Sequence, residues 1–335
     1  MWRARRGLSI AKRALLAGPM IESEYRLVTV FGGGGFIGRY VCEELMDAGA
    51  RVRVACREPR RAHFIQPLGQ VGQWGLVKSD GSDPASVARA VDGADAVINL
   101  IGSFKAMHAA HVTAPATIAR AARDAGAKSL VHVSAIGADA NAEAEYARTK
   151  AQGEAAVRDA FGQATIIRPS IVFGPEDQFT NRIAGLSRLP VLPVIAPACR
   201  FQPVFVEDLA KAIAAAALDP AAHAGNTYEI AGPQIFTMRE LTREILQAAG
   251  RDTALADVPG PVASLVSRLG FLPGAPLTRD QWLMLQRDNV ASPGSKGLAA
   301  FAIRPTPLGA VAPDWLGMYG GSRFARRRIN ITAIS

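Results

Sequence analysis

The strongest constraint on the fold of this chain is a run of four glycines, residues 32–35, between two short β-forming segments. Residues 27–31 (LVTVF) form an apolar run rich in β-formers, which is typical of a buried parallel strand. Residues 39–48 fit a helix that ends at Gly49, and residues 51–56 (RVRVAC) alternate as a second strand. A strand, a glycine-rich turn, a helix and a strand within about 30 residues predict the dinucleotide-binding unit of a doubly wound sheet.

The glycine spacing predicts how this turn would hold a dinucleotide. Gly33, Gly35 and Gly38 fit the pattern GxGxxG, and Gly32, Gly35 and Gly38 fit GxxGxxG. One glycine lets the chain turn sharply, a second lets the backbone approach the pyrophosphate, and Gly38 lets the helix pack closely on the strand. The pyrophosphate would then lie on free N–H groups at the start of the helix. The expected cofactor-binding residues of the turn are Gly32, Gly33, Gly35, Phe36, Ile37 and Gly38.

The end of the second strand favours NADP(H) over NAD(H). Proteins that bind NAD usually place an acid there, which holds the ribose hydroxyls. This strand instead ends in Cys56 and Arg57, with Arg60 and Arg61 one turn later. A guanidinium in place of the acid suits the 2′-phosphate of NADP, so Arg57 is the expected phosphate ligand. The alternative is a solvated surface arginine.

Strands and helices continue to alternate after this unit, as a parallel sheet requires. The next apolar runs end at polar or glycine residues, and the helical segments between them carry their own start and stop signals. The expected fold class is therefore α/β, a doubly wound parallel Rossmann sheet followed by a smaller, mostly helical C-terminal substrate or cap lobe. Further strands are expected over 77–80, 96–101 and 129–133, and helices over 83–91, 114–125 and about 146–161.

Three residues in the middle of the chain predict a site for acid–base chemistry. Tyr146 and Lys150 lie four apart in an expected helix and therefore share one face. Because an ammonium beside a phenol favours the ionised phenol, we expect the pKa of Tyr146 to fall and its phenol to act as a general acid. Ser134 follows the strand at 129–133, at the sheet edge where α/β proteins bind ligands. Ser134, Tyr146 and Lys150 are the candidate catalytic residues.

These motifs together resemble the extended short-chain dehydrogenase/reductase superfamily, over about residues 26–250. The resemblance implies that Tyr146 is the catalytic acid or base, that Lys150 lowers its pKa and binds the nicotinamide ribose, and that Ser134 positions the substrate. Thr113 stands where the family often has an asparagine. The resemblance further implies cofactor contacts from Asp80, Leu100, Ile101, Gly102, Lys150 and Pro169. It is carried by Gly32–Gly38, Asn99–Gly102, Ser134, Tyr146–Lys150, Arg168–Ser170, Phe173–Pro175, 201–210 and 226–230.

Within that superfamily one branch is most similar, the nucleotide-binding accessory subunit of respiratory complex I and its alphaproteobacterial relatives. The similar segments are 166–182, 277–281, 287–290 and 304–307. This resemblance implies tight NADPH binding without turnover and a place on the hydrophilic arm of complex I near the membrane. It implies a peripheral position on the cytoplasmic face of a bacterial inner membrane, or on the matrix side in a mitochondrion. Mitochondrial members tend to lose the Tyr-x-x-x-Lys pair that this chain keeps.

The chain is expected to divide around the nucleotide-binding unit. Residues 176–200 contain Pro190, Pro193 and Pro197, which predicts an irregular cover over the cofactor crevice. The expected parts are a basic extension at 1–24, an NAD(P)-binding domain at 25–175 completed by about 201–232, a cap lobe at 176–200 and 233–319, and a basic tail at 320–335.

The C-terminal third carries its own helix signals. Residues 237–249 predict an amphipathic helix that begins with Thr237 as N-cap and Glu240 at the capping-box position. The apolar stretch at 262–272 predicts a buried helix of the cap, and the alternative is a hydrophobic lip for a lipid or a quinone-like ligand. A short helix is expected over 280–286, and extended chain over 304–313.

Charge is needed to judge the class of partner. The net charge is +9, of which residues 1–26 and 320–335 carry +4 each, so the folded body is close to neutral. A nucleic-acid groove is therefore disfavoured, and the tails fit an anionic membrane surface or a partner better. Residues 1–20 are rich in arginine and free of acids, which is typical of a mitochondrial presequence or a helix on a membrane. The alternatives are an unstructured leader, or an upstream start codon with Met20 as the working start.

The residues that bind metals form no recognisable set. Cys42, Cys56 and Cys199 have no zinc spacing, and their odd number does not suit a disulfide framework. His108 and His111 are interpreted as ordinary polar helix positions. No metal is expected.

Two functions stay open from the sequence. The first is an accessory or assembly subunit of respiratory complex I that binds NADP(H). The second is an active NAD(P)-dependent reductase, dehydrogenase or epimerase that uses Ser134, Tyr146 and Lys150 on a carbonyl or sugar-type substrate.

Overall fold

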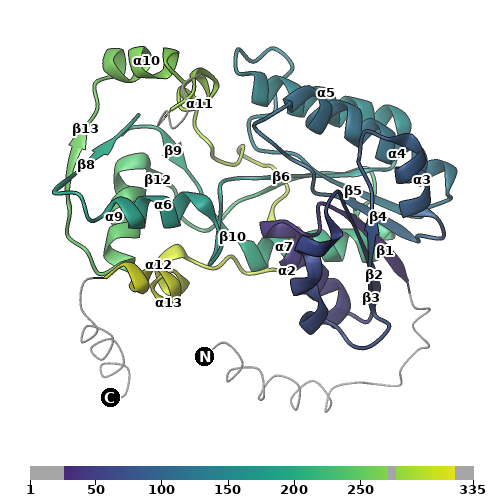
Figure 1. Ribbon diagram of the computed structural model, residues 1–335. Coiled ribbons are helices and arrows are strands. Elements are labelled where there is room, and N and C mark those ends of the chain that lie inside the picture. The colour runs from purple at the N-terminus through teal and green to yellow at the C-terminus, as the bar shows by residue number, and fades with distance from the viewer. Residues whose placement is uncertain (1–25, 271–276, 321–335) are drawn as a thin grey trace.

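The computed structural model describes residues 26–270 and 277–320. It contains a seven-stranded sheet in the order β11-β6-β5-β4-β1-β2-β3, in which each neighbouring pair is parallel (Figure 1). The order reverses between β1 and β4, which is the switch point where doubly wound proteins bind nucleotides. The expected α/β fold is thus confirmed. The strands are β1 (Leu27–Phe31), β2 (Arg51–Cys56), β3 (Trp74–Lys78), β4 (Ala96–Asn99), β5 (Ser129–Val133), β6 (Thr165–Pro169) and β11 (Thr227–Ile230).

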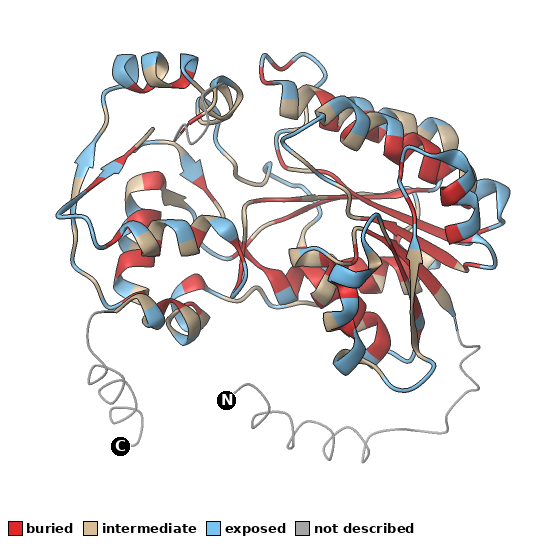
Figure 2. Ribbon diagram, in the orientation of Figure 1, coloured by how far each residue is buried: buried red, intermediate tan, exposed pale blue. Residues whose placement is uncertain are grey.

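Helices cover both faces of the sheet, which explains why its strands are apolar on both sides (Figure 2). Successive residues of one strand join different cores. Val30 packs in the same core as Val41 and Leu45 of the helix after the turn, whereas Phe31 packs in the core that contains Ile118. On one face lie α2 (Phe36–Asp47) and α7 (Val206–Leu218), and on the other lie α3 (Pro84–Val91), α4 (Ala114–Asp124) and α5 (Glu145–Ala160).

Local sequence signals set several helix ends as expected. The carboxylate of Asp83 accepts from the backbone N–H groups at the start of α3, so this residue is its N-cap. Thr237 and Glu240 form the capping box of α9 (Met238–Ala248). Helix α2 begins at Phe36, earlier than expected, directly after Gly35 as N-cap.

A smaller, mostly helical lobe lies beside the sheet (Figure 1). We call it the C-terminal lobe, and its helices and strands are α6 (Gln178–Leu186), β8 (Val191–Val194), β9 (Arg200–Phe201), β12 (Phe236–Thr237), α9, β13 (Ala254–Asp257), α10 (Gly260–Arg268), α11 (Arg279–Met284), α12 (Leu308–Val311) and α13 (Pro313–Leu316). The remaining elements are β7 (Val172–Phe173), β10 (Val204–Phe205), α8 (Pro220–His223) and the short turns η2 (Pro59–Leu68), η3 (Ala109–Thr113), η4 (Leu298–Phe301) and η5 (Gly317–Tyr319).

Two expectations of irregular or extended chain in the C-terminal lobe are wrong. Residues 176–200 are not irregular, because Asp177 caps helix α6 through the N–H of Thr180 and β8 pairs with β13. Residues 304–313 are not extended throughout, because α12 and α13 begin there. Pro313 occupies the first turn of α13, where a missing N–H costs nothing.

The apolar segment at 262–272 does not form a buried helix. The described part forms α10 and its C-cap residue Leu269, and the side chains of Val262, Leu265 and Leu269 are 49%, 63% and 52% exposed. The buried side of the same helix carries the small residues Ala263 and Ser267. The alternative, a lip for an apolar ligand, stays a prediction. The basic segments at 1–24 and 321–335 lie outside the described residues.

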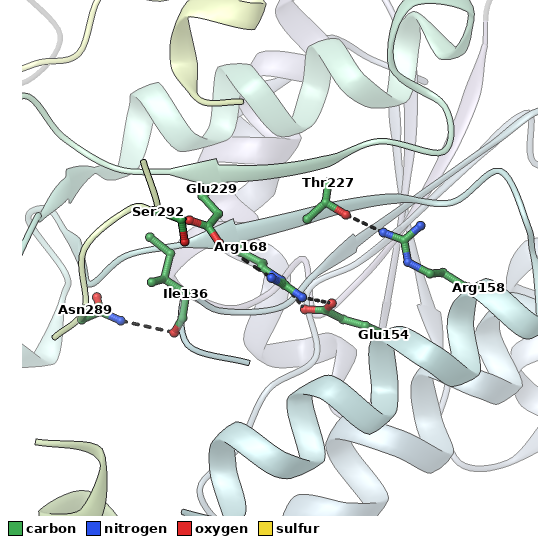
Figure 3. A network of polar contacts seen from close by, with 8 residues as sticks. All are labelled: Ile136, Glu154, Arg158, Arg168, Thr227, Glu229, Asn289 and Ser292. Atoms are coloured by element: carbon green, nitrogen blue, oxygen red, sulfur yellow. Dashed lines mark hydrogen bonds and ion pairs between the residues drawn. The ribbon is translucent and has the colours of Figure 1, made fainter. Parts of the chain in front are cut away.

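A buried ion cluster ties α5 to the sheet (Figure 3). Arg168 of β6 donates to both carboxylate oxygens of Glu154 at 2.8 and 2.6 Å, and its Nη1 lies 3.7 Å from Glu229 of β11. Glu229 also accepts the backbone N–H of Ser292 at 2.6 Å. Both carboxylates are buried and paired, as buried charges must be. The cluster therefore fixes α5, β6, β11 and the chain near Ser292 relative to one another.

Asn289 joins this returning chain to the carboxyl ends of the strands. Its Oδ1 accepts from the hydroxyl of Ser170 at 2.7 Å and from the N–H of Ile171 at 3.0 Å. Its Nδ2 donates to the carbonyl of Ile136 at 3.4 Å (Figure 3). The C-terminal lobe thus returns to the sheet edge that carries the candidate site.

Candidate functional site

The glycine-rich turn lies at the switch point, between the ends of β1 and β4. Gly32 has a φ of +78°, and a Cβ there would lie 3.2 Å from the carbonyl carbon of Leu100. A Cβ on Gly38 would lie 2.5 Å from the Gly32 oxygen, which no real Cβ tolerates. No side chain caps α2 at Gly35, so the first N–H groups of α2 remain open to an anion. The turn therefore fits a dinucleotide pyrophosphate.

The loops after β3 and β4 border the same turn. Leu100 and Ile101 are half-buried, and Gly102 is exposed. A Cβ on Gly102 would lie 3.7 Å from the Nζ of Lys150. Asp80 is exposed and accepts the N–H of Ser82 at 2.9 Å. A Cβ on the neighbouring Gly81 would lie 2.8 Å from the side chain of Ile101, so these two loops are adjacent.

Arginine side chains follow β2 as expected, and a further arginine lies in α2. Arg57 is exposed and has no ion pair within the described part of the chain, whereas Arg61 pairs with Glu58 at 2.8 Å. Arg39 was missed by the sequence reasoning. Its guanidinium lies 4.3 Å from the ring centroid of Phe64 and pairs with Glu176 at 2.6 Å.

Ser134, Tyr146 and Lys150 gather at the carboxyl end of β5. Ser134 is buried, and its hydroxyl has no hydrogen-bond partner among the described residues. The Nζ of Lys150 donates to the carbonyl of Val133 at 3.2 Å and lies 5.8 Å from the ring centroid of Tyr146. Pro169, also buried, ends the neighbouring β6 and accepts the N–H of Ile136 at 3.0 Å. An unpartnered buried hydroxyl beside a buried ammonium fits a polar ligand group.

The expected effect of Lys150 on Tyr146 is wrong in this structure. Burial raises the pKa of Tyr146 to about 12. The ammonium of Lys150 lies 5.8 Å from the centroid of the phenol ring and donates to the carbonyl of Val133. Burial also lowers the pKa of Lys150 to about 8, and Glu154 partly opposes that shift. At neutral pH the pair is therefore a protonated phenol and an ammonium.

His111 is not the ordinary polar helix position expected from its spacing to His108. It is fully buried in the π-helical turn η3, and its ring packs edge-on against Tyr146 at 5.2 Å. Its Nε2 accepts the N–H of Ser103 at 3.2 Å, which leaves Nδ1–H to donate to the hydroxyl of Thr149 at 2.9 Å. Burial, with a smaller effect of Lys150, lowers the pKa of His111 to about 4. The neutral ring thus joins the β4 loop to α5.

A second neutral histidine lies beneath the site. Asn99 accepts the N–H of Ile101 through Oδ1, so its Nδ2 donates to the Nδ1 of His132 at 3.1 Å. The Nε2 of His132 then carries the proton and has no partner among the described residues. Burial is the main reason that the pKa of His132 falls to about 3. Neither histidine was singled out as a site residue, because sequence spacing does not reveal burial.

Other kinds of site are not evident in the described residues. No group of three or more His, Cys, Asp or Glu residues there could hold a metal ion. No described helix is long and apolar enough to cross a membrane. One open hollow of about 460 Å³ is lined by residues 233 and 304–307. Another, of about 350 Å³, is lined by residues 235–236 and by residues of α9. Neither is lined by residues of the candidate site.

The fold and its glycine-rich turn define a protein of the NAD(P)-binding Rossmann class. A family model described as NAD(P)H-binding matches residues 32–187. The chain belongs to the family of NADH dehydrogenase (ubiquinone) 1 alpha subcomplex subunit 9, since it is 33% identical to the mitochondrial protein of that name from Rattus norvegicus over 84% of this chain and 77% of the relative.

Other relatives are reductases. The chain is 30% identical to the ceramide reductase of Caulobacter vibrioides, over 70% of this chain and 74% of the relative. In fold it is similar to the NADPH-dependent quinone oxidoreductase QOR2 of Escherichia coli in complex with NADPH, with a TM-score of 0.71 and 19% identity over 86% of this chain and 99% of that one.

The buried ammonium makes a prediction about stability. Replacing Lys150 by Met is expected to raise the free energy of unfolding at pH 7, in the absence of nucleotide, by about 2 kcal/mol, because it removes a buried charge at the loss of one hydrogen bond. The pKa of Lys150 is lowered on folding, so the unfolded chain binds more protons between pH 8 and 10.5. The stability of the wild type relative to K150M should therefore rise across that range. Chemical denaturation at several pH values measures both effects.

Lys128→Met is the matched control, because that side chain is 71% exposed and lies 4.0 Å from Asp95. It should change stability by less than about 0.5 kcal/mol at any pH. A K150M variant less stable than the wild type at pH 7, or a difference that does not vary with pH, would contradict this account.

Proposed function

We propose that this protein is an NADP(H)-binding accessory or assembly subunit of respiratory complex I. The observation that carries the proposal is the extent of the similarity to the complex I subunit, which spans 84% of this chain and so reaches well beyond the nucleotide-binding model at 32–187. The similarity therefore includes the C-terminal lobe. A Rossmann fold alone would account only for the nucleotide.

The cofactor proposed for the site is NADP(H) in preference to NAD(H). The glycine turn and the open start of α2 would hold the pyrophosphate, and Arg57 would hold the 2′-phosphate. Tyr146 and Lys150 would contact the nicotinamide ribose, with Ser134 beside them. Further contacts are proposed for Asp80, Leu100, Ile101, Gly102 and Pro169, which lie on the loops that border the turn and the strand ends.

The proposed partner is the hydrophilic arm of complex I, with peripheral attachment on the cytoplasmic face of a bacterial inner membrane or on the matrix side in a mitochondrion. The relatives from Rattus norvegicus and Neurospora crassa are named as mitochondrial subunits of NADH dehydrogenase (ubiquinone) and of NADH-ubiquinone oxidoreductase, which supports this location. The basic segments at both ends would add contacts to an anionic surface. The division at residues 25–175 with 201–232, and 176–200 with 233–319, belongs to the same proposal.

A second function is favoured by the intact Ser134, Tyr146 and Lys150 set, namely reduction of a carbonyl substrate. A bound NADPH would supply the hydride. Tyr146, protonated at neutral pH, would donate its proton to the carbonyl oxygen, and the unpartnered Ser134 hydroxyl would donate to the same oxygen. The relatives named 2-alkyl-3-oxoalkanoate reductase and ceramide reductase support this alternative.

The first prediction of the proposed function concerns the partner. Mild-detergent purification of the tagged protein from membranes of its own source should recover complex I subunits and NADP(H), as identified by mass spectrometry. A protein that runs as a monomer in native gels, separate from complex I, would exclude the accessory role.

The Gly38→Ala variant should lose the nucleotide, because its Cβ would meet the Gly32 oxygen. Gly75→Ala is the control: its Cβ would have no atom within 4 Å, so this variant should bind the nucleotide as the wild type does.

The second prediction concerns the 2′-phosphate. Arg57→Ala should weaken NADPH binding about tenfold or more, because a charged hydrogen bond is lost, and should leave NADH binding within twofold. Titration by nicotinamide fluorescence measures both. Arg61→Ala removes the same charge from the same loop, but its guanidinium is engaged by Glu58, so it should leave both affinities unchanged. Equal binding of NADH and NADPH by the wild type would overturn the proposed preference.

The third prediction separates the two functions. If the protein reduces 3-oxoalkanoate or ceramide-type ketones with NADPH, Tyr146→Phe should lower the turnover number at least about a hundredfold, because the proton donor is lost. NADPH binding should remain, since the ring is kept. Stopped-flow NADPH oxidation measures turnover. Turnover that survives in Y146F would exclude Tyr146 as the acid, and no turnover with any ketone would leave the accessory role alone.

A further inference from the structure

Helix α5, which carries Tyr146 and Lys150, has no cap of its own. Its N-cap residue is Ala144, whose side chain cannot accept the N–H groups of the first turn. The carboxylate of Asp280, in α11 of the C-terminal lobe, accepts them instead. Its Oδ1 accepts the N–H of Glu145 at 2.5 Å, and its Oδ2 accepts the N–H of Tyr146 at 3.2 Å. The cap is supplied by a residue 134 positions after Tyr146.

The position of Asp280 is fixed by its own helix. Thr278 and Gln281 form a capping box at the start of α11, with hydrogen bonds of 3.2 and 3.0 Å. Asp280 lies within this first turn and is half-buried. A carboxylate at the start of α5 also complements the positive end of that helix. The arrangement is a preformed acceptor rather than a mobile surface charge.

Other contacts tie the C-terminal lobe to the same region without touching α5. Arg287 donates to Asp139, in the loop between β5 and α5, at 2.7 Å. Asn289 joins Ser170 and Ile136, as described above. Of these contacts, that of Asp280 is made to the backbone of the residue that carries the candidate phenol.

We propose that Asp280 is a positioning residue for Tyr146. Through it, the C-terminal lobe sets the first turn of α5, so the lobe's position and the binding of the nicotinamide end of the cofactor are coupled. The proposal rests on the NADP(H) site proposed above. Coupling of this kind is reciprocal, so the cofactor should in turn stabilise α11.

The two ends of the cofactor provide the test. Adenosine 2′,5′-bisphosphate would occupy only the adenine half of the site, far from α5, whereas NADPH would reach Tyr146. Asp280→Ala should weaken NADPH binding about fivefold to tenfold, as expected for loss of a helix cap. Its affinity for the bisphosphate should stay within twofold of the wild-type affinity. The emission of bound NADPH should shift toward that of the free nucleotide. Asp280→Asn keeps the shape and one acceptor, so its NADPH affinity should lie between those of Ala and wild type.

Arg287→Ala is the matched control, since it breaks the contact to Asp139 and leaves the α5 N–H groups capped. The affinities of this variant for NADPH and for the bisphosphate should both stay within twofold of the wild-type values. Hydrogen exchange adds a second readout, because NADPH should slow exchange at residues 281–284 in the wild type and not in D280A. Should D280A not fold, D280N carries the test.

The proposal is overturned if D280A or D280N binds NADPH as the wild type does, if both ligands weaken equally, or if R287A has the same effect as D280A. The proposal is also overturned if the wild-type protein binds NADPH no more tightly than the bisphosphate, because the nicotinamide end would then contribute no affinity. A wild type that binds neither ligand would instead refute the proposed NADP(H) site.

Discussion

The close approach of two backbone segments at the glycine turn is the constraint on which the rest of the structure depends. Gly38 leaves no room for a side chain between the first turn of α2 and the oxygen of Gly32. This contact sets the angle at which α2 leaves β1, and α2 in turn packs against α7 on the same sheet face. The start of α2 then points its open N–H groups at the switch point between β1 and β4. The backbone thus offers an anion site that needs no net positive charge, so a nearly neutral body is compatible with the polyanionic cofactor proposed for it.

Features decided by neighbouring residues could be predicted from the sequence. The parallel sheet follows from apolar runs separated by helices, and the caps at Asp83 and Thr237 follow from side chains that reach only three residues along the chain. The four-residue spacing of Tyr146 and Lys150 likewise placed both on α5. In the two caps and in the Tyr146–Lys150 pair, the residues concerned lie within about one turn of one another.

Features decided by distant contacts could not be predicted. The pKa of Tyr146 is raised by burial, and the ammonium of Lys150 donates to the carbonyl of Val133 on β5. The role of His111 depends on Ser103 and Thr149, which three separate elements bring together. The segment at 176–200 looked irregular because of its prolines, yet β8 includes Pro193 and pairs with β13, a strand that follows much later. Spacing along the chain contains none of this information.

The electrostatics of the site connect its two candidate functions. The buried ammonium of Lys150 has one carbonyl acceptor and a carboxylate, Glu154, that is already committed to Arg168. Glu154 partly opposes the lowering of the Lys150 pKa, and both nearby histidines are neutral. A cofactor whose ribose and phosphates accept hydrogen bonds from this edge would recover part of the free energy cost of burying that ammonium. In the proposed NADP(H) site this gain would arise whether or not hydride transfer follows, so the same contacts would hold a permanently bound nucleotide and a catalytic one.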